Sequence, residues 1–139
     1  MGNFMKRLIS VSILLIGLLN SCTLPEYYQD PKILDRSRAE YRIILSTVSP
    51  LRLGKNLFQV RLTDPGGRPI TDATVTFFIR MAHMTFMMDQ VQSGKIIQPG
   101  VYQAEGEVVM GGDYDVNVEI ERPGLPKIRE EFVVNAGPM

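Results

Sequence analysis

The amino-acid sequence predicts an all-β domain, a single antiparallel immunoglobulin-like sandwich of about seven strands. Three observations lead to this prediction. Apolar side chains recur at every second position in several short runs, which is the period of a half-buried strand. Turns rich in glycine and proline separate these runs at spacings of about ten residues. No run has the period of about 3.6 residues that is typical of an amphipathic helix.

The predicted strands begin after residue 38. In residues 41–46 and 58–63, apolar side chains alternate with mostly polar ones, and "DPGGRP" ends the second run as a turn. The run "ATVTFFIRM" at 73–81 alternates in the same way. After a short link that "SGK" and "QPG" bracket, we expect strands in 101–110, 114–120 and 129–136. The expected core contains Phe58, Val60, Leu62, Val75, Phe77, Ile79, Tyr102, Val108, Val116 and Val118.

The amino terminus has the pattern of an export signal. Lys6 and Arg7 precede the apolar run "LISVSILLIGLL", as in the charged and apolar regions of a signal peptide. The run is shorter than the ~20 apolar residues that a membrane-spanning helix needs. We therefore expect residues 1–21 to be removed.

The only cysteine, Cys22, directly follows Leu19-Asn20-Ser21, and this tetrapeptide resembles the lipobox of bacterial lipoproteins. The resemblance implies acylation of Cys22 and anchoring to a membrane of the cell envelope. In a cell with two membranes it implies the outer membrane, facing the periplasm, because Thr23 rather than aspartate follows the cysteine. Ordinary signal cleavage that leaves a free thiol is the alternative. Residues 22–38 are then expected to be a lipid-anchored tether and residues 39–139 one sandwich domain.

Composition excludes several classes of function. Without Lys6 and Arg7, the 118 residues from Cys22 onward carry 13 basic and 15 acidic side chains, a formal net charge of −2. A nucleic-acid partner is therefore not expected, because such proteins need a clustered positive surface. An enzyme with a small-molecule substrate is not expected either, since His83 is the only histidine and has no serine in a strained turn beside it. Glu105 and Glu107 lie on the polar face of a strand, where a solvated role is expected.

The segment "MAHMTFMM" at 81–88 holds four of the eight methionines and the only histidine. Two interpretations are open. Methionine is an adaptable apolar residue, so the segment could pack in the core or under a loop. Alternatively, its thioethers and the His83 imidazole are soft ligands suited to copper(I). In a turn, Met84 would approach Met87 or Met88, residues three or four positions away.

The order "NLFQVRLTDPGGRPITDATVTFFIRMAHM", then "QPGVYQAEGEVVMGGDYDVNVEI", resembles the YtkA-like family of small exported sandwich domains, which is related to FixH-type proteins. The resemblance covers about residues 50–121. It assigns the family's methionine-rich segment to His83, Met84, Met87 and Met88, and the methionine before its glycine pair to Met110. Tyr114 stands where many relatives have tryptophan. The resemblance implies copper handling or support of metal efflux and oxidase assembly, and thus a role in metal homeostasis. We expect that no cofactor is required for folding.

Two functional hypotheses follow from these observations. The first is a lipid-anchored module that binds or passes copper(I) through the methionine and histidine side chains. The second is a non-catalytic lipoprotein whose methionine-rich loop is a contact patch for another envelope protein. Their geometry distinguishes them, because ligands must converge on one point whereas a contact patch spreads over a surface.

Overall fold

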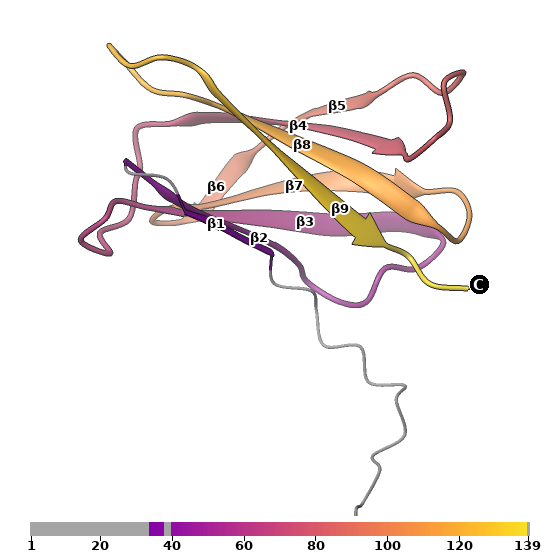
Figure 1. The fold of residues 1–139 in the computed structure, drawn as a ribbon. Coiled ribbons are helices and arrows are strands. Elements are labelled where there is room, and N and C mark those ends of the chain that lie inside the picture. Colours follow the sequence, from indigo (N-terminus) through magenta and orange to yellow (C-terminus); the bar gives the residue numbers. More distant parts are fainter. Residues whose placement is uncertain (1–33, 38–39, 139) are drawn as a thin grey trace, which may run out of the picture.

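The computed structural model describes residues 34–37 and 40–138 (Figure 1). Every regular secondary-structure element in these residues is a β-strand. The predicted signal peptide, Cys22 and most of the predicted tether lie outside the described residues. The strands are β1 (Leu34–Ser37), β2 (Arg42–Thr47), β3 (Gly54–Thr63), β4 (Thr74–Met81), β5 (Gln90–Ser93), β6 (Lys95–Gln98), β7 (Val101–Val108), β8 (Asp113–Glu121) and β9 (Ile128–Asn135). In the described ranges, no helix is long and apolar enough to cross a membrane.

The strands form two antiparallel sheets that face each other. One sheet has the order β1-β2-β3-β7-β6 and the other has the order β5-β4-β8-β9. Apart from β1, this is the arrangement of strands A, B, E and D against C′, C, F and G in immunoglobulin-like domains. The predicted antiparallel immunoglobulin-like sandwich is confirmed, with nine strands in place of about seven.

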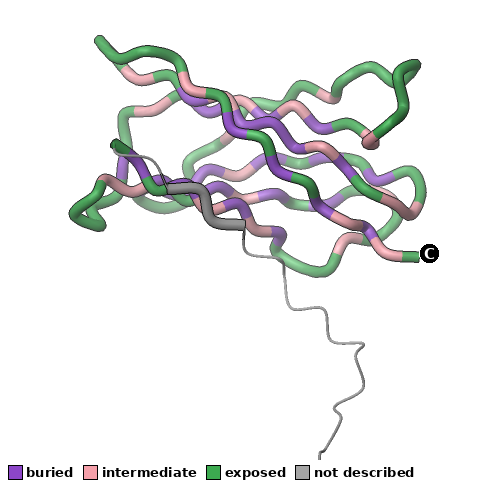
Figure 2. The backbone as a smooth tube through the Cα atoms, viewed as in Figure 1, coloured by how far each residue is buried: buried purple, intermediate pink, exposed green. Residues whose placement is uncertain are grey.

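The core fills the space between the two sheets (Figure 2). All ten residues predicted for the core are at most 3% exposed. They come from β3, β4, β7 and β8, in which every second side chain is buried. The alternation in the sequence therefore identified the buried face of each long strand correctly.

Three short strands were not predicted. Strand β1 lies within residues 22–38, the range expected to be a tether, and pairs with β2. Strands β5 and β6 occupy the expected link, and all of their side chains except Gln90 are exposed. Because they bury no face of their own, they leave no alternation in the sequence. Gly94 joins them where the chain changes sheet, and a Cβ atom at Gly94 would lie 3.0 Å from the Phe77 ring.

The register of the strands places three loops at one end of the sandwich. Gly54 at the start of β3 is opposite Val108 at the end of β7. Met81 at the end of β4 is opposite Tyr114 near the start of β8. The connections at 48–53, 82–89 and 109–112 therefore lie together, and we call this the methionine end. The turns after β3, β6 and β8 form the opposite end.

Candidate metal site

The β4–β5 loop, residues 82–89, carries most of the candidate ligands. The Ala82 amide donates a hydrogen bond to the Asp113 carbonyl at 2.8 Å, which fixes the start of this loop beside β8. The Met87 amide then donates to the Met84 carbonyl at 3.4 Å. This hydrogen bond closes a turn over residues 84–87, with Met84 and Met87 at its two ends. Their side chains are 37% and 40% exposed.

His83 occupies an unusual backbone conformation at the start of this turn. Its φ angle is 63°, and among the described residues every other positive φ belongs to glycine. A side chain in this left-handed region costs about 1 kcal/mol or more relative to the ordinary helical region. Such strain is often found where a side chain has a functional role.

Met110 is held in the neighbouring β7–β8 loop by a buried tyrosine. Tyr114 is 1% exposed, and its hydroxyl donates a hydrogen bond to the Met110 carbonyl at 3.0 Å. The same oxygen accepts hydrogen bonds from the amides of Val109, at 3.1 Å, and Met110, at 3.3 Å. This is the tyrosine corner of immunoglobulin-like domains, in which a tyrosine near the start of strand F binds the backbone just before it. It sets the position of Met110 relative to β8.

Gln90 fixes the far end of the β4–β5 loop. Its side-chain amide donates to the Glu107 carbonyl at 2.9 Å and its oxygen accepts from the Glu107 amide at 2.8 Å. These two bonds join β5 of one sheet to β7 of the other. No role was expected for Gln90 from the sequence, because a single glutamine in a polar link has no pattern that would indicate one.

Arg80 adds ion pairs next to the loop. Its Nε atom lies 3.4 Å from a carboxylate oxygen of Asp115 and 4.0 Å from one of Asp89. All three side chains are 28–48% exposed, so solvent screening keeps their contribution to stability small.

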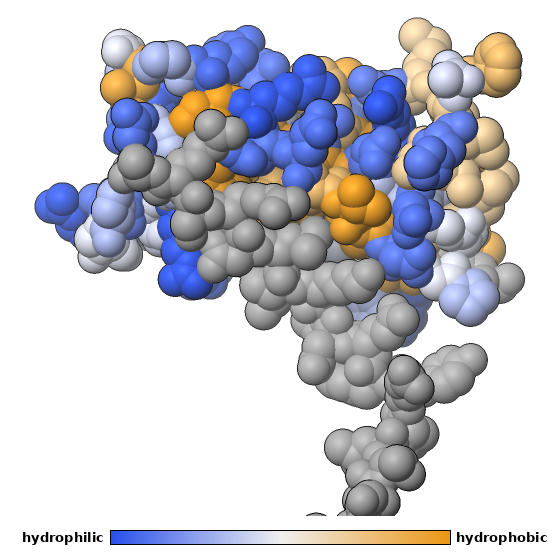
Figure 3. Space-filling view, in the orientation of Figure 1, coloured by the Kyte–Doolittle hydropathy of each residue, from blue (hydrophilic) through white to orange (hydrophobic). Residues whose placement is uncertain are grey.

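The structure divides the five candidate ligands into two groups. His83, Met84 and Met87 share the β4–β5 loop, and Met110 lies in the β7–β8 loop that Tyr114 holds. Met88 is 91% exposed and extends into solvent, as does Phe86 at 98%. Orange and pale orange side chains gather at this end of the molecule, at the upper right of Figure 3.

The donor chemistry of the methionine end fits a soft metal ion. Among the described residues, no three side chains of histidine, cysteine, aspartate or glutamate lie close enough together to hold a metal ion. The loops of this end carry thioethers, from Met84, Met87, Met88 and Met110, and the imidazole of His83. Such donors favour copper(I), whereas calcium and magnesium favour oxygen ligands.

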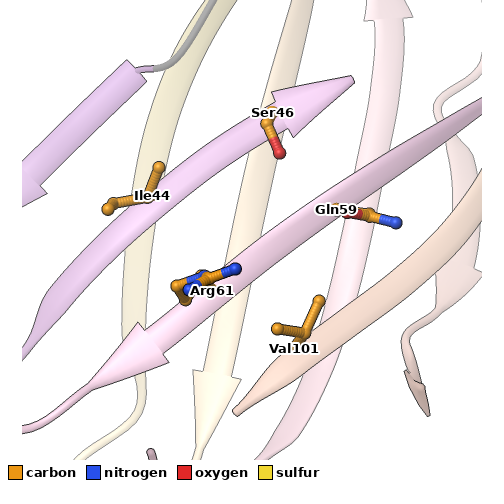
Figure 4. A pocket seen from close by; sticks show the side chains of 5 residues that line it. All are labelled: Ile44, Ser46, Gln59, Arg61 and Val101. Atoms are coloured by element: carbon orange, nitrogen blue, oxygen red, sulfur yellow. The ribbon is translucent and has the colours of Figure 1, made fainter. Parts of the chain in front are cut away.

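Two surface depressions have linings that do not suggest catalysis. One, of about 460 Å³, lies beside the β7–β8 loop and is lined by Gly111, Gly112, Asn135, Gly137 and Pro138. The other, of about 230 Å³, lies on the outer face of the five-stranded sheet and is lined by Ile44, Ser46, Gln59, Arg61 and Val101 (Figure 4). Neither set of described lining residues pairs a nucleophile with a base.

Comparisons with known proteins support the fold. The model of the YtkA-like family matches residues 36–119. FetP from uropathogenic Escherichia coli is 11% identical, with a TM-score of 0.58 over 79% of this chain and 97% of FetP. A copper-bound variant of FetP has a TM-score of 0.53 at 11% identity, over 76% of this chain and 95% of the variant.

A DUF4426 family protein from Pseudomonas aeruginosa PAO1 has a TM-score of 0.55 at 12% identity, over 76% of this chain and 98% of that protein. No curated protein matches this chain in sequence. At these identities the similarity to the solved structures shows a shared sandwich fold.

Proposed function

Because the chain belongs to the YtkA-like family, we propose that it is an envelope protein that binds copper(I) through His83, Met84, Met87 and Met110. The observation that supports this proposal is that these four residues lie on two loops at the same end of the sandwich. The copper-bound structure of a FetP variant, a sandwich of similar fold, is consistent with it. Met88 belongs to the same segment but extends away from the turn, so we assign it a minor contribution.

The exposure of the proposed ligands favours transfer of the metal over storage. Met84, Met87 and Met110 are 37–43% exposed, so a partner's ligands could reach a bound ion without unfolding of the loop. Copper(I) accepts few ligands, and thioether sulfur is a soft donor. The protein would then hold copper(I) and pass it to another site in the envelope.

We propose that this function is non-catalytic and takes place at a membrane. Acylation of Cys22 would anchor the domain by several buried acyl chains, each methylene adding about 0.8 kcal/mol. Replacement of Cys22 by serine is expected to release the protein into the soluble fraction or to leave its precursor uncleaved. Mass spectrometry that finds an unmodified Cys22 in the mature protein would contradict this proposal.

Competition for copper(I) against a chromogenic chelator, under reducing conditions, tests the metal site. We expect Met84→Ile to weaken binding, and its volume change is too small for a cavity to explain the loss. Met88→Ile is the matched control, because it removes an exposed thioether of the same segment and should weaken binding much less. Zinc should compete poorly, since thioethers are not among the usual ligands of zinc.

A contact patch for another envelope protein is the second candidate function. It is favoured by Phe86 and Met88, which are 98% and 91% exposed and are of the kind found at adaptable interfaces. It requires neither metal preference nor pH dependence. If the wild-type chain fails to compete for copper(I), this second function replaces the first.

A further inference from the structure

The methionine end is the apolar end of the described domain. Of the 14 large hydrophobic side chains that are exposed in the described residues, eight lie in its three loops. The outermost include Leu53 at 59%, Phe86 at 98% and Met88 at 91%. The turns of the opposite end expose one such side chain, Leu125 at 44%. Exposed apolar surface is therefore concentrated in three loops at the same end of the domain.

The amino-terminal end of β1 lies on the same side of the sandwich. Leu34 is opposite Leu45 and Ser37 is opposite Arg42, so β1 runs antiparallel to β2. Since β2 runs toward the methionine end, β1 starts on that side and runs away from it. The chain therefore enters β1 on the side of the methionine end. The twelve residues from Cys22 to Ile33 span at most about 40 Å when extended.

From these two observations we infer that the methionine end rests on a lipid bilayer, with Phe86, Met88 and Leu53 inserted at the level of the headgroups. This inference goes beyond the copper function and does not depend on it. Apolar side chains of interfacial segments bury to a depth of about 5–10 Å, which projecting loop tips can reach. The tether and the loops then contact the same membrane, and the opposite end faces away from it.

The charges at this end favour an uncharged lipid surface. Lys55 at the start of β3 is paired with Glu105 at 2.8 Å, and Arg80 is paired with Asp115 and Asp89. Arg52 of the 48–53 loop is a further cation, and the carboxylates of Glu107 and Asp113 at the same end offset it, so no excess of positive charge is left to attract anionic headgroups. Insertion should therefore occur on zwitterionic lipids and should change little with salt concentration.

The chain contains no tryptophan, so a single introduced tryptophan can report on contact with lipid. We would prepare Phe86→Trp and, as the matched control, Leu125→Trp at the opposite end. Each full chain is incorporated into protein-free vesicles of phosphatidylcholine with brominated acyl chains, which quench tryptophan on contact. We expect blue-shifted, quenched emission at position 86 and unchanged emission at position 125. Equal quenching at both positions, or none at position 86, overturns the inference.

A second measurement separates insertion from anchoring by the lipid. In the Cys22→Ser chain, the fraction that floats with vesicles should fall several-fold when Phe86 and Met88 are both changed to serine. Val133→Ser is the control, because Val133 is 54% exposed but lies on an outer sheet face. If the double substitution has no greater effect than the control, the inference fails. Quenching at position 86 that requires added envelope proteins would assign the surface to a protein partner and also overturn it.

Discussion

Replacement of Tyr114 by phenylalanine tests how the fold positions Met110. The change removes one hydroxyl and leaves the Met110 carbonyl and the amides of Val109 and Met110 without their partner. Tyr114 is 1% exposed, so water cannot take the place of the hydroxyl from the core side. Loss of a partner for a buried polar group costs about 1–3 kcal/mol, and the lower end applies here because Val109 and Met110 are 44% and 43% exposed. We expect a loss in that range, against a total stability of about 5–15 kcal/mol.

Tyr102→Phe is the control for this substitution. The Tyr102 hydroxyl is also buried, donates to the Ile70 carbonyl at 3.0 Å and accepts from the Ala73 amide at 3.3 Å. It lies at the opposite end, far along β7 from Met110. Both variants should lower the midpoint of chemical denaturation.

Affinity for copper(I) then distinguishes the two tyrosines. Tyr114→Phe should weaken copper(I) binding about fivefold if disorder of the β7–β8 loop costs about 1 kcal/mol. Tyr102→Phe should leave the affinity unchanged. Equal affinities for both variants would refute the argument that the tyrosine corner positions a ligand, and an unchanged denaturation midpoint for Tyr114→Phe would refute the stability argument.

Three further predictions follow from the backbone and from charge. Gly100→Ala should lower the thermal denaturation midpoint more than Gly124→Ala. Both glycines have positive φ angles, but only at Gly100 would a Cβ atom meet the backbone, 2.8 Å from the Leu62 carbonyl oxygen. Equal losses for the two variants would contradict this prediction. Hydrogen bonding to Arg122 lowers the pKa of Asp72 from its ordinary value of 3.8. The ion pair between Asp72 and Arg122 therefore stabilises the folded state above pH 3.8, and this stabilisation is lost as the pH falls through the lowered pKa. The difference in unfolding free energy between the wild type and Asp72→Asn should therefore become smaller below pH 3.8. A difference that stays constant with pH would contradict this prediction. His83→Gly should raise the unfolding free energy by up to about 1 kcal/mol, because glycine adopts the positive φ angle without strain. It should also lower the affinity for copper(I). A variant that loses both stability and copper(I) affinity would show that His83 has a structural role.

The loss of copper(I) on His83→Gly should also depend on pH. Imidazole binds a metal ion only without its second proton, so protons compete with the metal ion for the ring nitrogen. Titrations against the chelator should therefore show a larger difference between wild type and variant at pH 7 than at pH 5. An equal difference at both values would remove His83 from the ligand set.

The sequence predicted the long strands well because each of them has one buried face. Phe58, Val60 and Leu62 alternate with polar residues, and all three are fully buried. The sequence did not predict β5 and β6, because these edge strands contribute no buried face and depend on their neighbours for hydrogen bonds. Burial leaves a period of two in a sequence, whereas edge pairing leaves none.

The candidate site was predicted less completely, because it depends on contacts between loops. Spacing suggested that Met84 approaches Met87 or Met88, and the structure shows a backbone hydrogen bond between Met84 and Met87. Met110 was suggested only by the resemblance to a family, since the approach of two loops cannot be derived from one alternating strand. The part played by the Tyr114 hydroxyl had no signal, because the alternation shows only that its ring is buried.

The segment that changes sheet at Gly94 limits how the two layers can move. Strands β5 and β6 belong to different sheets but are joined by one residue, and the Gly94 amide is bonded to the Val75 carbonyl at 2.8 Å. Sliding of one sheet over the other would stretch this short connection and break the Gln90 bonds to β7. At this edge the two sheets therefore behave as one rigid body. If the methionine end binds copper(I) as we propose, uptake and release would then proceed by rotation of methionine side chains and by bending of the loops.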